Sequence, residues 1–254
     1  MTLPRTPSFR LDGRSALVAG ASSGIGVACA VALAEQGAKV TLCARREGEL
    51  KSLAEEMRAA GMQADILALD ITDLAATEAA IAARSPFDVL VNSAGMARHS
   101  PAALTTAEDF DAVASLNLRA AYFLTQSVAR RLLAEGRPGS LINITSQMAH
   151  VGGPDRAVYA ATKHAVEGMT KSMAIEWGPY GIRVNTIAPT FIRTALTAQT
   201  FANPERAAWI ASKIKLGRVG EVEDIMGPVA FLASDAAALI TGTSLIVDGG
   251  WTAD

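Results

Sequence analysis

The sequence has little of what would place it among several common classes of protein. Its 254 residues carry 23 basic and 25 acidic side chains, which gives a formal net charge of −2. A nucleic-acid-binding protein normally shows a basic excess, so this balance argues against such a partner. No run of about 18 apolar residues occurs, and no membrane-spanning helix is expected.

Cysteine is also scarce, because only Cys29 and Cys43 are present and each lies within an apolar run. Two such thiols cannot form the disulfide framework of a small secreted protein, so we expect both to be free and buried. The residues from Met1 to Pro7 lack the apolar core of a signal peptide. We therefore expect a cytoplasmic protein, and we expect no metal site.

Short apolar or β-branched runs alternate with longer helical stretches along the whole chain. The expected strands are Ser15–Ala19, Lys39–Cys43, Ala64–Leu69, Phe87–Asn92, Ser140–Thr145, Arg183–Ala188 and Ser244–Val247. Such alternation predicts a mostly parallel sheet with helices on both faces. Because no linker, repeat or low-complexity tract interrupts it, residues 1–254 are expected to form one doubly wound α/β domain.

The connection between the last two expected strands is much longer than a simple crossover requires. Within it, Thr194 to Lys215 is predicted to form one or two short helices interrupted near Asn203 and Pro204. An insertion after the carboxyl end of a strand is well placed to cover a ligand. We expect residues at about 190–220 to form a lid over the substrate. The alternative is a packed helical excursion without mobility.

A glycine-rich turn, read as G-x-x-x-G-x-G, joins the first expected strand to the first helix. Gly20 permits a tight turn, Gly24 lets a diphosphate approach the backbone, and Gly26 lets helix and strand pack closely. The open N–H groups at the helix start would face the diphosphate, unless the glycines serve only steric needs. The candidate cofactor residues of this turn are Gly20, Ser22, Ser23, Gly24, Ile25 and Gly26.

The end of the second expected strand distinguishes NAD from NADP. An acidic residue there would bond the ribose 2′-hydroxyl and repel a 2′-phosphate. This chain has Arg45 and Arg46 at that point and no carboxylate before Glu47. A guanidinium pairs well with phosphate, so Arg45 favours NADP over NAD. The alternative is a solvated arginine at a strand end.

Tyr159 and Lys163 lie four residues apart in a long helical stretch, which places both side chains on one face. An ammonium near a tyrosine hydroxyl stabilises the phenolate and lowers its pKa. A tyrosine so tuned can exchange a proton with a carbonyl or an alcohol. Ser146 follows the fifth expected strand, so its hydroxyl should lie at the carboxyl edge of the sheet.

In this combination the chain resembles the short-chain dehydrogenase/reductase family in its single-domain form. The motifs that carry the resemblance are the glycine turn, Val91-Asn-Ser-Ala-Gly95, Asn117, Ser146, Tyr159-x-x-x-Lys163 and Asp248-Gly-Gly250. The resemblance covers nearly the whole chain and implies a Rossmann fold of about seven strands. It also implies hydride transfer between a nicotinamide cofactor and a secondary alcohol or ketone.

The resemblance implies particular roles. Tyr159 would be the general acid/base, and Lys163 would lower its pKa and bind the nicotinamide ribose. Ser146 would bond the substrate oxygen, and Asn117 would hold a water in the proton relay to Lys163. The remaining candidate cofactor residues are Asp70, Ile71, Asn92, Ala94, Gly95, Pro189, Ile192 and Thr194.

Two residues depart from the family pattern. Ala19 stands where the family normally has threonine, and its loss of a hydroxyl would loosen the turn without removing a phosphate contact. Thr190 follows Pro189 where the family has glycine, which leaves open the backbone conformation beside the nicotinamide.

The substrate is less clearly indicated. The loop after Ser146 carries His150 and Arg156, and Arg98 and His99 follow the fourth strand. These groups would suit a small polar substrate such as a sugar acid, sugar or polyol, although His150 could instead bond a backbone carbonyl and the arginines could be solvated.

Two alternatives remain open, and one expectation concerns assembly. The resemblance also permits a 3-oxoacyl-[acyl-carrier-protein] reductase or a steroid-type dehydrogenase. An acyl-carrier protein would need a basic docking face, for which Arg130 and Arg131 are the nearest candidates. A non-catalytic nucleotide-binding protein is the alternative of another class, against which all four catalytic residues are present. The resemblance implies a homotetramer.

Overall fold

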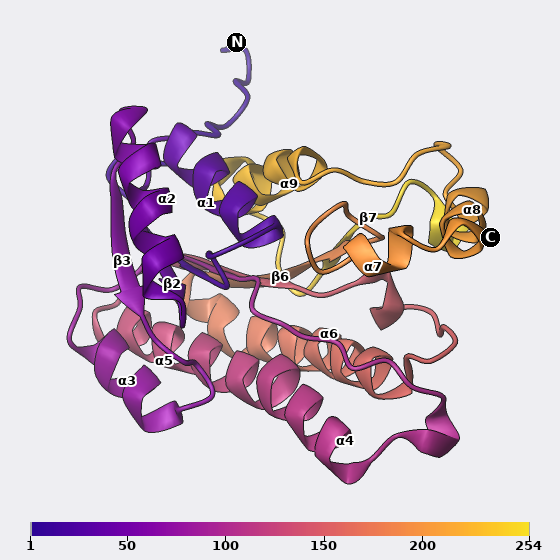
Figure 1. The fold of residues 1–254 in the computed structure, drawn as a ribbon. Helices are drawn as coiled ribbons and strands as arrows, with labels where there is room; N and C mark the ends of the chain where they lie inside the picture. The colour runs from indigo at the N-terminus through magenta and orange to yellow at the C-terminus, as the bar shows by residue number, and fades with distance from the viewer. Residues whose placement is uncertain (1, 254) are drawn as a thin grey trace.

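Seven parallel strands form one sheet in the order β3-β2-β1-β4-β5-β6-β7 (Figure 1). The computed structural model describes residues 2–253. The strands are β1 Ser15–Ala19, β2 Lys39–Ala44, β3 Ala64–Ala68, β4 Val89–Asn92, β5 Gly139–Ile144, β6 Ile182–Pro189 and β7 Ser244–Val247. The seven strand predictions are confirmed, and every neighbouring pair is parallel.

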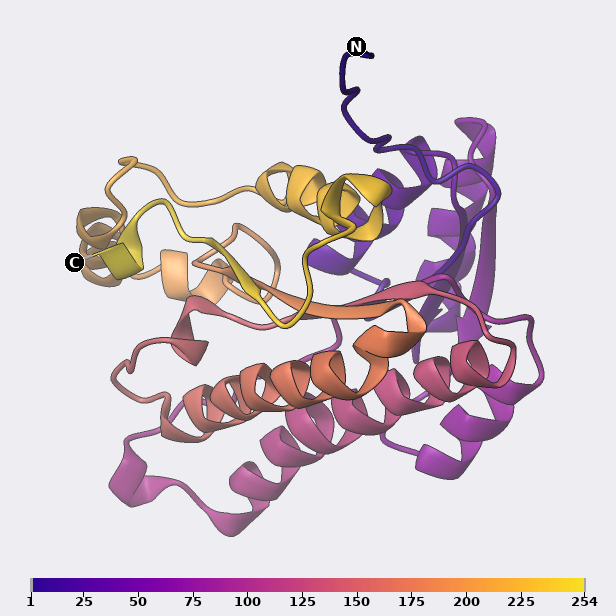
Figure 2. The same cartoon turned by 180° about the vertical axis from the view of Figure 1, so that it is seen from behind.

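Helices cover both faces of the sheet, as the two views show (Figures 1 and 2). They are α1 Ile25–Glu35, α2 Glu47–Ala59, α3 Leu74–Ala82, α4 Ala107–Ala114, α5 Ala121–Ala134, α6 Ala157–Trp177, α7 Ala198–Phe201, α8 Pro204–Lys213 and α9 Glu223–Ala233. Helices α1, α2 and α9 pack on one face, and α3, α5 and α6 pack on the other. The doubly wound α/β fold is therefore confirmed.

Alternate side chains along each strand supply the two cores. Ala16 and Val18 of β1 pack toward α1 and α9, whereas Leu17 and Ala19 face the opposite core. Both cysteines are free and buried, as expected, and burial raises the pKa of each thiol to about 12. None of the helices within residues 2–253 is long and apolar enough to cross a bilayer.

Strand β1 lies between β2 and β4. From β1 the chain extends the sheet on one side through β2 and β3, and it then crosses to the other side of β1 to form β4. Ligands of doubly wound folds bind outside the carboxyl ends of the strands at such a switch point. The insertion after β6 forms α7 and α8, and the predicted break at Asn203 is the N-cap of α8. Trp209 of α8 lies 5.3 Å, ring centre to ring centre, from Trp251, so α8 packs beside the C-terminal segment (Figure 2).

Candidate active site

A cleft of about 580 Å³ opens at the carboxyl edge of the sheet around the switch point. The predicted cofactor residues that line it are Gly20, Ser22, Ser23, Gly24, Ile25, Arg45, Asp70, Ile71, Ala94, Gly95 and Thr194. Six others do not line it: Gly26, Asn92, Lys163, Pro189 and Ile192 are buried, and Tyr159 is partly buried. The structure thus brings together residues from five separate connections of the chain.

The glycine turn is shaped by close backbone approaches. Gly20 has a φ of +77°, and a Cβ there would lie 2.7 Å from the Ala94 nitrogen. A Cβ on Gly26 would collide with the Gly20 carbonyl oxygen. The N–H groups of Gly20 and Ala21 donate to the Cys43 carbonyl, so backbone bonds hold the turn although Ala19 lacks a hydroxyl.

The amino end of α1 fits the diphosphate of a dinucleotide. Gly24 is the N-cap, and no side chain caps the first turn of the helix. Helix N–H groups left without such a cap, together with the helix dipole, favour a phosphate at that position. The absence of a side chain at Gly24, where a Cβ would lie 3.1 Å from Thr194, keeps the backbone accessible.

Two arginines stand at the end of β2, on one side of the cleft. The Arg45 side chain is 75% exposed and its Nη1 lies 3.9 Å from an Asp70 oxygen. Arg46, which the sequence argument passed over, donates to the Ser22 hydroxyl at 2.9 Å and also lines the cleft. The cluster of two guanidiniums at the end of β2 can receive a ribose 2′-phosphate.

Tyr159, Lys163 and Ser146 meet beside the opposite end of the cleft. Lys163 Nζ donates to the Ile144 carbonyl at 2.9 Å and lies 5.6 Å from the centre of the Tyr159 ring. The Ser146 hydroxyl accepts from the Met148 N–H at 3.1 Å and lies near enough to Tyr159 to lower its pKa. A Cβ on Gly95 would lie 3.7 Å from Lys163 Nζ, which places the lysine next to the cleft lining.

Burial is the largest influence on the pKa values of Tyr159 and Lys163. It raises the pKa of Tyr159, while the hydrogen bond from Ser146 and the charge of Arg156 oppose that rise. Lys163 is not among the groups that act on this pKa here, so its role in lowering the tyrosine pKa stays a prediction. Burial also lowers the pKa of Lys163 to about 8, although the Glu167 carboxylate opposes this shift.

Asn117 lies in a π-helical stretch, Ser115–Ala120, that joins α4 to α5. Its side chain accepts from the Met96 N–H at 2.9 Å and donates to the Met96 carbonyl at 2.8 Å. A Cβ on Gly95 would lie 3.5 Å from its Oδ1, so Asn117 and Lys163 flank the same glycine. π-bulges occur frequently at functional sites, and this one brings a buried amide to the same glycine as the lysine.

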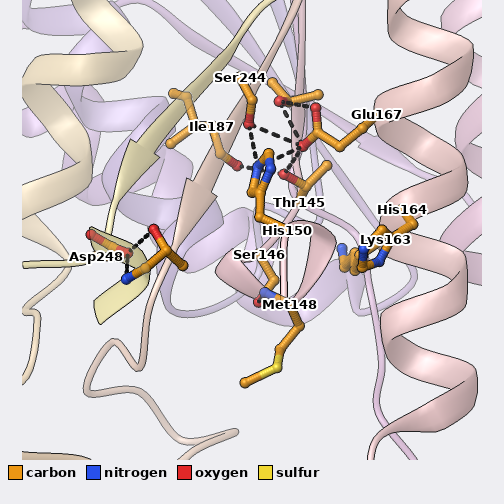
Figure 3. Close-up of polar contacts among 12 residues, drawn as sticks. Thr145, Ser146, Met148, His150, Lys163, His164, Glu167, Ile187, Ser244 and Asp248 are labelled. Atoms are coloured by element: carbon orange, nitrogen blue, oxygen red, sulfur yellow. Dashed lines mark hydrogen bonds and ion pairs between the residues drawn. The ribbon is translucent and has the colours of Figure 1, made fainter. Parts of the chain in front are cut away.

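Glu167, one helical turn after Lys163, ties α6 to the sheet (Figure 3). Its carboxylate accepts from Thr145 at 2.7 Å, from Thr186 at 2.8 Å and from Ser244 at 3.1 Å. His150 Nε2 lies 2.9 Å from the same Ser244 hydroxyl. This network fixes the strand ends around Ser146, and His150 is turned into it.

The other predicted polar groups divide between the site and the surface. Arg98 pairs with Asp109 at 2.6 Å and is not directed at the tyrosine. His99 lies edge-on to Tyr159, with 6.3 Å between ring centres, and receives a 3.1 Å hydrogen bond from Arg156. Thr190 N–H donates to Val247, so the backbone beside the cleft continues the pairing of β6 with β7.

Sequence reasoning did not assign several residues that line the cleft, most of them outside the quoted motifs. They are Cys43, Ala44, Arg46, Leu69, Thr72, Ser93, Met96, Ala112, Ser115, Leu116, Ala195 and Leu196. It also missed Glu167, which the i,i+4 spacing from Lys163 could have indicated. The position of Arg46 beside Arg45 was a further usable signal.

The fold, the glycine turn and the tyrosine–lysine pair define a dinucleotide-dependent oxidoreductase. Comparisons with known proteins agree. A family model described as Enoyl-(Acyl carrier protein) reductase matches residues 20–252. The chain is 42% identical over 245 residues to D-erythrulose reductase of Gallus gallus, covering 96% of this chain and 98% of the relative. The chain belongs to the short-chain dehydrogenase/reductase family of NAD(P)-dependent enzymes acting on CH–OH groups.

Further relatives support this assignment. Gluconate 5-dehydrogenase of Gluconobacter oxydans is 38% identical over 248 residues, with 96% of each chain covered. A crystal structure of a gluconate 5-dehydrogenase from Burkholderia cenocepacia, in complex with NADP and tartrate, has a TM-score of 0.94 and 38% identity. That comparison covers 97% of this chain and 98% of the other.

The buried Lys163 should make stability depend on pH. Its pKa is lowered from 10.5 to about 8 in the folded chain, so between these values the unfolded chain binds more protons and stability rises with pH. Relative to Lys163→Met, the wild type should gain about 2 to 3 kcal/mol of unfolding free energy between pH 7 and pH 10. Urea denaturation at both pH values measures this, and Lys171→Met on the same helix is the control. An equal pH response in wild type and Lys163→Met would contradict it.

Proposed function

We propose that this protein catalyses the reversible NADP-dependent oxidation of a secondary alcohol in a small polyhydroxylated substrate, a sugar, polyol or sugar acid. The observation that carries the proposal is the grouping of Tyr159, Ser146 and Lys163 beside a dinucleotide-shaped cleft. The names of the relatives, among them L-xylulose reductase of Homo sapiens at 39% identity, support this substrate class.

The residues act on the proton and on orientation. When bound, the nicotinamide accepts a hydride from the alcohol carbon or returns one to the ketone carbon. In oxidation Tyr159 takes the hydroxyl proton as the C–H bond breaks, and in reduction it returns that proton to the carbonyl oxygen. Ser146 holds the reacting oxygen, and Lys163 binds the nicotinamide ribose and passes protons toward Asn117. Residues 190–220 would cover the cleft through Thr194 and its neighbours.

Arg45 supplies a test of the cofactor assignment. Arg45→Glu should raise KM for NADPH by about 10- to 100-fold, because one charge-assisted contact to the 2′-phosphate is lost and a repulsion is gained. NADH, which lacks that phosphate, should lose nothing. Steady-state kinetics with both cofactors measure this, with Lys39→Gln at the other end of β2 as the control. A parallel loss for NADH and NADPH would contradict the assignment.

A 3-oxoacyl-[acyl-carrier-protein] reductase is the second candidate, favoured by the description of the matching family model. Its basic docking face is weak, because Arg130 pairs with Glu78 at 2.8 Å and Arg131 with Glu135 at 3.1 Å. A screen of purified enzyme against sugars, sugar acids, polyols and 3-oxoacyl esters decides. Turnover confined to the esters would replace the sugar proposal.

We also propose that the protein works as a cytoplasmic homotetramer. Strand β7 is an edge strand whose Ile246 is 40% exposed, and Leu239 nearby in the chain is fully open. An edge strand with exposed apolar side chains offers a surface on which another chain can pair or pack. Light scattering of the purified protein, with a chain mass of 26.4 kDa, measures the assembly.

A further inference from the structure

Four separate segments bring basic and aromatic side chains to one side of Tyr159. Arg156 is the residue before α6, and its guanidinium carbon lies 5.1 Å from the centre of the Phe191 ring. Its Nη1 lies 3.1 Å from His99 Nε2, and the His99 ring meets the Tyr159 ring edge-on. Arg206 of α8 lies 4.0 Å from a carboxylate oxygen of Asp155, the residue next to Arg156, and its charge lowers the pKa of His99 and of Arg156.

Arg156 is the least expected member of this group, since only 9% of it is exposed. Within residues 2–253, no carboxylate lies within ion-pair distance of its guanidinium. A buried charge of this kind is costly unless it is paired, and a guanidinium is always charged in proteins. Stacking on Phe191 fixes the plane of the Arg156 guanidinium. The N–H groups that do not bond His99 can then donate to a planar acceptor with two oxygens, such as a carboxylate.

With the contributions of His99, Arg206 and Asp155 included, the surroundings of Arg156 carry about one uncompensated positive charge. Burial, together with the charges of Arg156 and Arg206, lowers the pKa of His99, so the ring is neutral near pH 7. Arg206 lies 4.0 Å from an Asp155 oxygen, which partly offsets its charge. A single net charge matches a carboxylate better than a dianionic phosphate.

We propose that Arg156, assisted by His99 and Arg206, binds a carboxylate on the substrate, so that the preferred substrates are aldonates and their keto forms rather than neutral sugars or polyols. This inference rests on the proposed function and narrows it. It makes Arg156 a specificity-determining residue, separate from the residues that transfer the proton. Because Arg206 lies on α8, the carboxylate would also draw the lid segment toward the site.

The charge of Arg156 also acts on the reacting tyrosine. It favours the phenolate of Tyr159, so its removal should move the pH at which alcohol oxidation reaches half its maximum upward. A residue with a purely structural role would not produce this shift. The pH profile of kcat therefore accompanies the specificity measurement below.

The sharpest test compares D-gluconate with D-glucitol, which differ only in having a carboxylate or a hydroxymethyl group at one end. We expect the wild type to prefer D-gluconate in kcat/KM. Arg156→Gln should raise KM for D-gluconate by about 100-fold, as expected for two lost charge-assisted hydrogen bonds, with at least a tenfold smaller change for D-glucitol. Arg156→Lys should restore part of the preference.

Controls separate the possible failures. Arg98→Gln removes a neighbouring arginine that is paired with Asp109 and should leave the preference intact. NADPH fluorescence and thermal melts report folding, and Arg206→Gln, on an exposed helix, should lower the preference by about three- to tenfold if Arg156→Gln does not fold. Equal losses for both substrates, or no loss, would overturn the inference alone. A preference for D-glucitol 6-phosphate over D-gluconate would also overturn it, and turnover of none of the three would overturn the proposed function with it.

Discussion

Replacing Tyr159 by phenylalanine is expected to lower kcat by about 10³-fold or more while NADPH affinity stays within a factor of two to three. The change removes one oxygen and keeps the ring that lies against His99. Under the proposed function, it removes the hydroxyl that would exchange a proton with the substrate oxygen held by Ser146. The hydride would then have to move without a proton donor.

The measurement is single-turnover absorbance of NADPH, combined with fluorescence titration of NADPH in the absence of substrate. Tyr180→Phe is the matched control, because that tyrosine is 64% exposed in the short 3-10 helix after α6, and the change should lose no activity. A residual kcat within tenfold of the wild type would contradict the assignment of the general acid/base. Loss of NADPH binding in step with kcat would instead indicate that the phenol holds the cofactor site together.

The fold was predictable because its signals are local. Each strand is a short apolar run such as Val89–Asn92. Gly20 and Gly26 mark the junction of β1 and α1, where close backbone approaches leave no room for a side chain. The carboxyl ends of parallel strands share one edge, so Ser146 could be placed near the glycine turn without any knowledge of contacts. The i,i+4 spacing of Tyr159 and Lys163 was enough to predict that both side chains lie on one face of a helix.

The arrangement around Arg156 was not predictable to the same degree. His99, Arg156, Phe191 and Arg206 come from four segments, and no spacing in the chain records their proximity. The sequence pointed equally to Arg98 and His99, but Arg98 turns outward to Asp109. Likewise His150 was a candidate substrate residue, yet the structure engages it with Ser244 and Glu167.

The pKa of Tyr159 shows why charge arguments from sequence have limits. Proximity of Lys163 in the helix suggested a lowered pKa, but the sign depends on desolvation, which only the packed structure reveals. The same burial lowers the pKa of Lys163 itself.

Gly26→Ala is expected to destabilise the fold by about 3 kcal/mol and to weaken NADPH binding by about 100-fold, the upper range for overpacking a rigid contact. The added methyl group would collide with the carbonyl oxygen of Gly20, and that oxygen belongs to the turn that faces the diphosphate. The Gly20 carbonyl cannot rotate away as a flexible side chain can. Either α1 must therefore move away from β1, or the glycine turn between them must open. Both changes displace the N–H groups at the start of α1.

The matched control is Gly48→Ala, because Gly48 lies in α2 and a Cβ there meets nothing within 4 Å. That substitution should raise stability by up to about 1 kcal/mol, since alanine is the better helix former. Urea denaturation and NADPH titration of both variants separate a general effect of alanine from a local collision. If Gly26→Ala bound NADPH as tightly as Gly48→Ala does, the close contact between α1 and the glycine turn would not be what shapes the diphosphate site.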